Sequence, residues 1–202
     1  MESPEAGNST PNSSRSEIAF TGDARALGFA AFATTTFLFG LSFTTIWSRQ
    51  PSVVAAIAVA VAFGGAIQVL AGIWAFARHQ AFPAVAFCSF GAFYLSYYLF
   101  VHTITIGLSS GDLATATSVF FLAWLILSTY VFLAALRVSA ATAVTYFFWW
   151  LTYLLLVIGG FLGNADVIIG GGAAGVATAG FAWYASCALL VNETAGRKVL
   201  RP

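Results

Sequence analysis

Charged side chains are scarce in this sequence. Asp, Glu, Lys and Arg make up 7% of the 202 residues, whereas 60% of the residues are hydrophobic. Soluble domains carry about 25% charged residues, and a chain with so few charges cannot cover a water-exposed surface. The composition therefore excludes an ordinary soluble domain and indicates an integral membrane protein.

Cysteine is rare as well. The two cysteines, Cys88 and Cys187, are far apart in long apolar stretches, so they form neither a metal-ligand spacing nor a redox pair. We expect both thiols to be buried as small apolar side chains. We expect no metal, no cofactor and no nucleic-acid partner. The apolar stretches also lack the clustered acids that a membrane phosphotransferase needs, so we do not expect an enzyme.

Six long stretches contain no Asp, Glu, Lys or Arg, and each exceeds the roughly 20 residues with which an α-helix crosses a bilayer. Transmembrane β-strands need only about 9–11 residues and alternate polar with apolar side chains, which these stretches do not. The sequence therefore predicts an all-α membrane protein with six transmembrane helices. Their expected ranges are 26–47, 52–76, 83–107, 114–136, 142–163 and 168–191.

Basic residues are distributed unequally between the two sides of this arrangement. Six spans place both termini on one side, and only Arg49 falls on the other side, together with Asp112 and Asp166. The positive-inside rule therefore predicts that both termini lie in the cytoplasm. The basic residues on the terminal side are Arg15, Arg25, Arg78, Arg137, Arg197, Lys198 and Arg201.

Two tails flank the predicted transport domain, which covers residues 23–194. Residues 1–22 are rich in Ser, Asn, Pro and Gly, so we expect a disordered cytoplasmic tail there. Residues 195–202 are expected to form a short basic cytoplasmic tail.

The predicted spans hold no Asp, Glu, Lys or Arg. Such residues mark ion paths and voltage sensors inside membranes, so their absence argues against a carboxylate-based cation pump and a voltage sensor. His102 lies late in the third span, near the outer interface, where a structural role is the simpler interpretation and proton sensing the alternative. Neutral polar side chains remain, and these suit a small polar or anionic solute. The candidates to line a pore are Thr35, Gln68, Ser89, Tyr94 and Asn164.

Gln68 is the one strongly polar side chain of the second predicted span, and small residues surround it at helical spacing. Gly64, Gly65, Ala71 and Gly72 lie three or four positions away and therefore share its face. Two interpretations are equally open: Gln68 either bridges to a neighbouring helix or contributes a polar point to a pore wall. In the sixth span, Gly171-x-x-x-Gly175 is a small-xxx-small pattern that favours helix packing.

Three stretches carry a resemblance. FGGAIQVLAG (63–72) is similar to a second helix reading Gly-Gly-x-x-Gln-x-x-Ala-Gly, and AFPAVAFCSFGAFYLS (81–96) resembles the third helix of the same proteins. VNETAGRKVLRP (191–202) resembles their C-terminal Asn-Glu-x-x-Gly-Arg-x-Val-Leu-Pro, and Gly163-Asn164 fits the end of their fifth helix. These are motifs of the acetate uptake transporter family, the succinate–acetate permeases. The resemblance extends over residues 23–202.

The start of the first predicted helix departs from this family. Where the family reads Asn-Pro-Ala-Pro-Leu-Gly-Leu, residues 23–29 read DARALGF. Both prolines, which preset the backbone where a helix starts, are missing, and Asp23 and Arg25 add charges. We therefore expect a degenerate entrance motif, with Leu27 and Gly28 retained, and a pore entrance of different shape.

The resemblance implies a homohexamer in which each protomer encloses its own six-helix pore. It also implies a narrow hydrophobic constriction with one residue each from helices one, three and five. By position these are Phe32, Phe90 and Trp149, with Trp150 as the alternative on helix five. A tryptophan there is bulkier than the leucine that the family tends to use. Gln68 and Thr35 then become candidates to line the pore.

These observations together predict a plasma-membrane transporter or channel for small monocarboxylates, acetate first and succinate second. The substrate is expected to move with a proton or as the neutral acid through the aromatic constriction. Two alternatives stay open: a pore for a neutral small molecule such as ammonia, and a membrane scaffold or sensor that has kept the fold without conducting. The altered entrance motif and the bulk of Trp149 are the features that favour these alternatives.

Overall fold

The computed structural model describes residues 23–44, 59–104 and 106–201, and within these ranges it is helical throughout apart from turns. Six helical segments are long and apolar enough to cross a membrane, which confirms the predicted fold class. They are α1 (Ala24–Ser42), the π-helix η2 (Ala60–Ile67) continued by α3 (Gln68–Ala77), α4 (Ala81–Leu99) continued by the π-helix η3 (Phe100–Ile104), α5 (Ser110–Ala135), α6 (Ala140–Leu162) and α7 (Ala165–Ala195).

Polar caps fix where four of these helices start. The side chains of Asp23, Ser109, Ser139 and Asn164 each accept a hydrogen bond from a backbone N–H in the first turn of α1, α5, α6 and α7. Such caps satisfy N–H groups that have no partner inside the helix. Because Asn164 caps α7 and Gly196 ends it at a φ of 62°, this helix extends beyond the predicted 168–191 at both ends.

The end of the first predicted span and the start of the second are not matched by described helix. The first was expected to continue to residue 47, but α1 ends at Ser42, and residues 45–58 lie outside the described part of the chain. The start of the second predicted span, 52–58, therefore lies outside it as well. The predicted tail at 1–22 has the same status.

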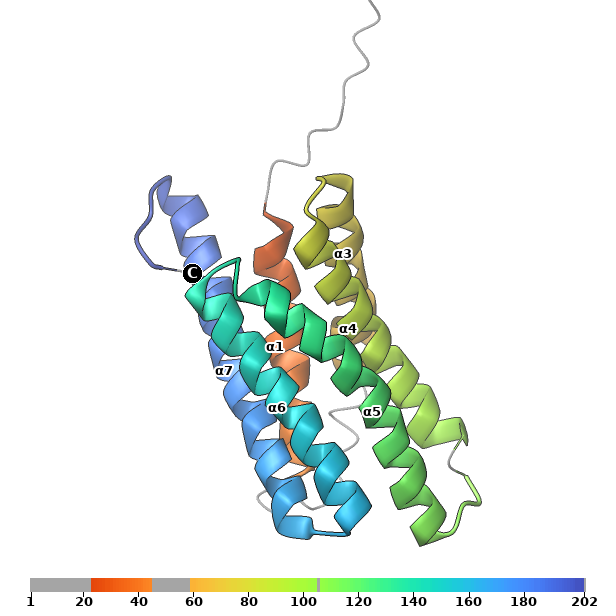
Figure 1. Ribbon diagram of the computed structural model, residues 1–202. Helices are drawn as coiled ribbons and strands as arrows, with labels where there is room; N and C mark the ends of the chain where they lie inside the picture. The colour runs from red at the N-terminus through yellow and green to blue at the C-terminus, as the bar shows by residue number, and fades with distance from the viewer. Residues whose placement is uncertain (1–22, 45–58, 105, 202) are drawn as a thin grey trace, which may run out of the picture.

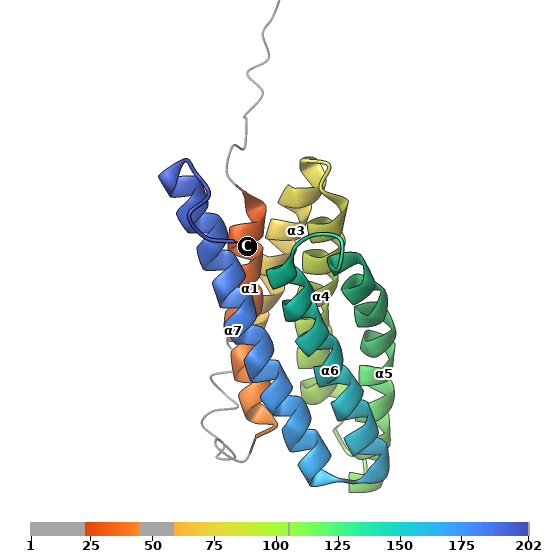
Figure 2. The ribbon, with the colours of Figure 1, turned by 60° about the vertical axis from the view of Figure 1, so that its left-hand side comes forward.

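The helices pack side by side as a bundle (Figures 1 and 2). The start of α1, the α3–α4 turn, the α5–α6 turn and the end of α7 lie at one end, uppermost in Figure 1, which we call the terminal end. α1 packs against α7 on one side and against η2 and α3 on the other, and α6 packs between α5 and α7. The terminal end carries Arg25, Arg78 and Arg137, whereas Asp112 and Asp166 lie in the first turns of α5 and α7 at the opposite end.

Glycines allow α1 and α7 to approach closely. A methyl group at Gly172 would overlap the carbonyl oxygen of Gly40, and one at Gly175 would press on the Cα of Gly40. Gly171 packs against Leu156 of α6. The packing interpretation of the small-xxx-small pattern in the sixth span is therefore confirmed.

Aromatic side chains fill the centre of the bundle, and aliphatic side chains cover much of its outside. Leu122, Ile126 and Leu133 project from α5 in this way. One expectation was wrong: Cys187 lies on the exposed surface of α7, and Cys88 is only half-buried against Gly72. An outward thiol is compatible with lipid, which is as apolar as the protein interior.

Candidate functional site

The three residues expected at the constriction meet in the centre of the bundle. The ring of Trp149 lies edge-on to Phe32 and Phe90, with centroids 5.2 and 6.0 Å away, and Phe32 and Phe90 are 5.9 Å apart. All three side chains are fully buried. α1, α4 and α6 thus each supply one ring to a closed aromatic contact, which we call the aromatic gate.

The two neighbouring tryptophans of α6 point in different directions. Trp149 points inward to the aromatic gate, whereas Trp150 points to α5, where its indole N–H donates to the Thr129 hydroxyl at 3.0 Å. Trp150 also stacks on Phe132. The residue that meets Phe32 and Phe90 is therefore Trp149.

Two tyrosines of α6 that the sequence analysis did not single out belong to the same cluster. Tyr146 stacks on both Phe32 and Phe90, with centroids 5.9 and 5.8 Å away, and Tyr153 lies 4.7 Å from Trp149. Together with Thr142 they form a stripe at steps of four, three and four residues. This helical spacing of aromatic residues with polar edges was a signal that could have found them.

The stripe on α6 leaves three hydrogen-bonding groups unsatisfied. The Trp149 indole N–H and the hydroxyl groups of Tyr146 and Tyr153 are buried and have no hydrogen-bond partner among the described residues. A buried polar group without a partner costs about 1–3 kcal/mol. These three donors lie beside one aromatic gate and are free to donate hydrogen bonds to a polar solute.

Gln68 is fully buried at the junction of η2 and α3, and neither its amide nitrogen nor its amide oxygen has a partner among the described residues. The glycines on its face make close contacts with two neighbouring helices. Gly64 packs against Thr35 of α1, and Gly72 packs against Cys88 of α4. The Gln68 face of the second span is thus turned inward.

The other polar candidates differ in how much hydrogen-bonding capacity they keep. The Thr35 hydroxyl is buried and donates to the Ala31 carbonyl at 2.9 Å. Tyr94, also buried, shares a 2.5 Å hydrogen bond with the Thr36 hydroxyl. Ser89 is half-buried next to Phe90 in the chain. Of this set, only Gln68 is both fully buried and unpaired.

Asn164 lies apart from this cluster. It is exposed at the start of α7, and its amide oxygen accepts hydrogen bonds from the N–H groups of Asp166 and Val167 at 3.0 and 3.2 Å. Its role in the structure is that of a helix cap at the end of the bundle opposite the terminal end.

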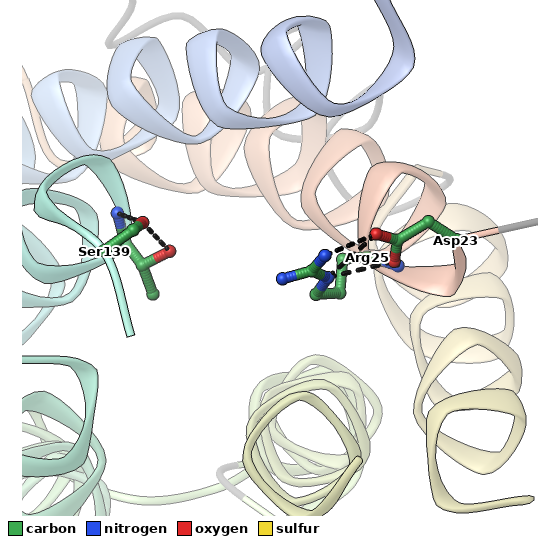
Figure 3. Close-up of polar contacts among 4 residues, drawn as sticks. Asp23, Arg25 and Ser139 are labelled. Carbon is green, nitrogen blue, oxygen red and sulfur yellow. Dashed lines mark hydrogen bonds and ion pairs between the residues drawn. The ribbon is translucent and has the colours of Figure 1, made fainter. Parts of the chain in front are cut away.

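The degenerate entrance motif forms a compact polar contact at the terminal end (Figure 3). Asp23 caps α1 and forms an ion pair with Arg25, with 2.6 Å between its Oδ2 and the Arg25 Nη2. Burial alone would raise the pKa of Asp23, but the hydrogen bonds and charge of Arg25 outweigh it and hold this pKa below its ordinary value. The stability that this pair contributes is therefore present at neutral pH and is lost as the pH falls through the lowered pKa. Behind the pair, Leu27 packs against the core and Gly28 against Phe87.

This architecture matches a known family over nearly the whole chain. The model of the GPR1/FUN34/yaaH family matches residues 6–200. The chain belongs to this family. The resemblance to the acetate uptake transporters is thereby confirmed.

Relatives within the GPR1/FUN34/yaaH family carry two kinds of transport name. A protein of Escherichia coli named succinate-acetate/proton symporter SatP is 26% identical over 86% of this chain and 91% of its own length. A protein of Saccharomyces cerevisiae named ammonia transport outward protein 2 is 29% identical over 78% of this chain, which spans only 57% of that relative.

A solved structure gives the same result for the fold. The structure of the bacterial acetate channel SatP superposes on this chain with a TM-score of 0.81 at 26% identity, covering 89% of this chain and 97% of the other. The family therefore supports monocarboxylate transport by a multi-pass membrane protein, and the relatives named here are transporters and channels rather than enzymes.

Proposed function

We propose that this protein conducts small monocarboxylates, acetate first, through the aromatic gate of each protomer. The observation that carries the proposal is the set of unpaired donors on α6 beside the gate. A carboxylic acid offers two acceptor oxygens, and the Trp149 N–H with the Tyr146 and Tyr153 hydroxyls offers donors that no described side chain uses. The rings themselves form an apolar passage that disfavours a bare anion.

Gln68, on a different helical segment, supports the same proposal. A bridging role requires a partner on a neighbouring helix, and its amide has none among the described residues. Its position at the junction with the π-helix η2 adds to this, because π-helical turns occur frequently at functional sites. We propose that Gln68 lines the path, with Thr35 and Tyr94 nearby, whereas Asn164 acts as a cap.

The proposal includes an orientation of the protein in the membrane and an oligomeric state. The protein lies in the plasma membrane with the terminal end in the cytoplasm, because Arg25, Arg78 and Arg137 lie at that end. Exposed aliphatic side chains leave ample surface for lipid and for neighbouring copies, in keeping with a homohexamer. The solute moves with a proton or as the neutral acid, acetate before succinate.

A second candidate is a pore for ammonia, which the name of the yeast relative favours. Ammonia needs a single hydrogen-bond acceptor or donor at a time and would also pass an apolar gate. The name of the bacterial acetate channel and the number of unpaired donors favour the carboxylic acid.

Uptake into proteoliposomes separates the candidates. Purified protein is reconstituted, and influx of labelled acetate is measured with and without an inward proton gradient. Internal pH is followed in a parallel assay after addition of ammonium. We expect acetate influx above empty liposomes that rises with the gradient. Ammonia flux without acetate flux would establish the second candidate. The absence of both fluxes would favour a scaffold or sensor.

A further inference from the structure

Two cavities at the terminal end meet at the degenerate entrance motif. One, of about 520 Å³, lies between α1, α6, α7 and the C-terminal segment, and the other, of about 190 Å³, lies between α1, α4 and α6. Arg25, Phe29, Val138 and Thr142 line both. We treat the two cavities as one vestibule.

The charged side chains that line this vestibule are of one sign. Arg25, Lys198 and Arg201 line the larger cavity, and no Asp or Glu is among the described residues that line either cavity. α6 also begins here, capped by Ser139, and the start of a helix carries partial positive charge. Two independent elements therefore favour an anion in the same space.

The C-terminal segment is held where its basic side chains can take part. After Gly196 the chain turns back on α7, where the Asn192 side chain accepts hydrogen bonds from the N–H groups of Val199 and Leu200 at 2.6 and 2.9 Å. The Tyr184 hydroxyl donates to the Arg201 carbonyl at 3.0 Å. These bonds place Lys198, Leu200 and Arg201 in the vestibule wall.

Arg25 has an unused edge toward the vestibule. Its Nε donates to both carboxylate oxygens of Asp23 and its Nη2 to Oδ2, whereas its Nη1 has no hydrogen bond within the described residues. Figure 3 shows the guanidinium extending from α1 toward Ser139, with the Asp23 carboxylate on the side away from Ser139. Asp23 thus orients Arg25 and offsets part of its charge.

The vestibule leads to the aromatic gate. Phe29 lies in its wall, with its ring 6.3 Å from that of Tyr146, and Tyr146 stacks on Phe32. Phe82, which lines the smaller cavity, lies edge-on to Tyr146 at 5.6 Å. A solute that leaves the vestibule inward therefore meets the gate next.

From this arrangement we propose that the vestibule is an anion-binding site, in which Arg25, Lys198 and Arg201 hold the carboxylate form of the substrate on the terminal side of the gate. The choice of a small carboxylate rests on the proposed function. The partial neutralisation of Arg25 by Asp23 keeps the site weak, so that the bound carboxylate can take up a proton and leave. An unopposed arginine would hold the anion more tightly and would disfavour its protonation.

The test is equilibrium binding of acetate to the full chain in phosphatidylcholine nanodiscs at pH 7.5, where acetate is the anion. Saturation-transfer NMR on the acetate methyl group gives the Kd. We expect Arg25→Gln to raise the Kd at least threefold and the double variant Lys198→Gln/Arg201→Gln to do the same. Asp23→Asn, which keeps a capping side chain, should lower the Kd. Arg197→Gln is the matched control, because Arg197 lies in the same segment and does not line the vestibule.

Two variants distinguish a loss of binding from a loss of folding. Arg25→Lys keeps the positive charge beside Asp23 and should bind within about twofold of the wild type. The double variant removes charges outside the helices and should leave folding intact. A Kd unchanged in both the Arg25→Gln and the double variant would overturn the vestibule, whatever the flux. Lack of acetate uptake by a wild-type protein that still shows charge-dependent binding would instead overturn the proposed function.

Discussion

The indole ring of Trp149 meets the ring of Phe32 edge to face, with centroids 5.2 Å apart and ring planes inclined by 88°. The two residues lie 117 positions apart in the chain and come from α1 and α6. Phe90 lies against both. The narrowest apolar point of the proposed path is therefore set by three side chains whose size can be changed one at a time.

Shortening a side chain of the gate should relax its size selectivity. We expect Trp149→Leu, Phe32→Ala and Phe90→Ala to increase the butyrate-to-acetate uptake ratio about tenfold, the discrimination that a methylene group can produce in an apolar site. Uptake of both acids into proteoliposomes measures it. Trp150→Leu is the control, because Trp150 faces α5. An unchanged ratio in all three gate variants would place the narrow point elsewhere.

Removing a donor while keeping its ring tests the unpaired groups on α6. Tyr146→Phe and Tyr153→Phe retain the aromatic packing but lose a hydroxyl that has no partner among the described residues. We expect each change to lower acetate flux up to about tenfold, because one hydrogen bond contributes about 0.5–1.5 kcal/mol. Size selectivity should stay at the wild-type value, and thermal stability should hold or rise, because an unpaired buried hydroxyl group is removed. Full flux in both variants would mean that the hydroxyls do not contact the solute.

How far the sequence predicts this molecule depends on the kind of pattern. The absence of charge over long stretches predicts the spans well, because burying charge in a bilayer is costly for any fold. Motif resemblance predicts three constriction positions, Phe32, Phe90 and Trp149. Only the structure shows that their rings touch one another. Hydrophobic periodicity cannot distinguish η2 from an α-helix, so the π-helical turns before Gln68 were not predicted.

The roles that the sequence did not reveal depend on local contacts rather than on residue type. Tyr146 and Tyr153 lie in an apolar span, and the sequence does not show that their hydroxyl groups are buried without a partner. Asn164 was grouped with pore candidates because it is polar, but its position just before a helix is typical of a cap. The contact of the C-terminal segment with α7 joins residues seven or eight positions apart through a turn at Gly196, which composition alone does not reveal.

Gln68→Leu separates the two interpretations of this residue by the sign of a stability change. If Gln68 lines the path, flux should fall, and stability should hold or rise by up to about 1–3 kcal/mol, because an unpaired buried amide is removed. A bridging glutamine would instead lose about 0.6 kcal/mol, the average of interhelical hydrogen bonds in membranes. Thermal unfolding in detergent and acetate uptake are measured on the same preparation. Normal flux with lowered stability would contradict the pore-lining role.

Two glycines of α7 provide a matched test of the close approach to α1. Gly172→Ala would place a methyl group against the Gly40 carbonyl oxygen, whereas Gly180 has no described atom near the position of an added methyl group. We expect Gly172→Ala to cost about 1–3 kcal/mol through overpacking. Gly180→Ala should be neutral or stabilising by up to about 1 kcal/mol, since alanine favours helix. Equal melting temperatures of the two variants would show that α1 and α7 are not held in contact there.

The form in which the solute crosses the gate sets its pH dependence. An unpaired carboxylate in an apolar passage is costly, and proton-coupled carriers commonly use a titrating Asp, Glu or His along the path. None of the predicted spans contains an acid, and His102 is exposed in η3, where it stacks on Tyr98. We therefore expect the proton to travel on the substrate as the neutral acid. Flux should rise as the pH of the source compartment falls and should track the pKa of the substrate, which is about 4–5 for an aliphatic carboxyl group.

Two acids of similar size and different acidity test this directly. Acetate and the more acidic monochloroacetate are compared in proteoliposomes over a range of source pH, with wild-type protein and with His102→Ala. At a given pH a smaller fraction of the stronger acid is neutral, so its flux should be lower, and its profile should be displaced to lower pH by the difference between the two pKa values. His102→Ala should leave both profiles unchanged. A single profile for both acids with a midpoint near 6.5, abolished by His102→Ala, would mean that a protein group titrates, and the neutral-acid route would be wrong.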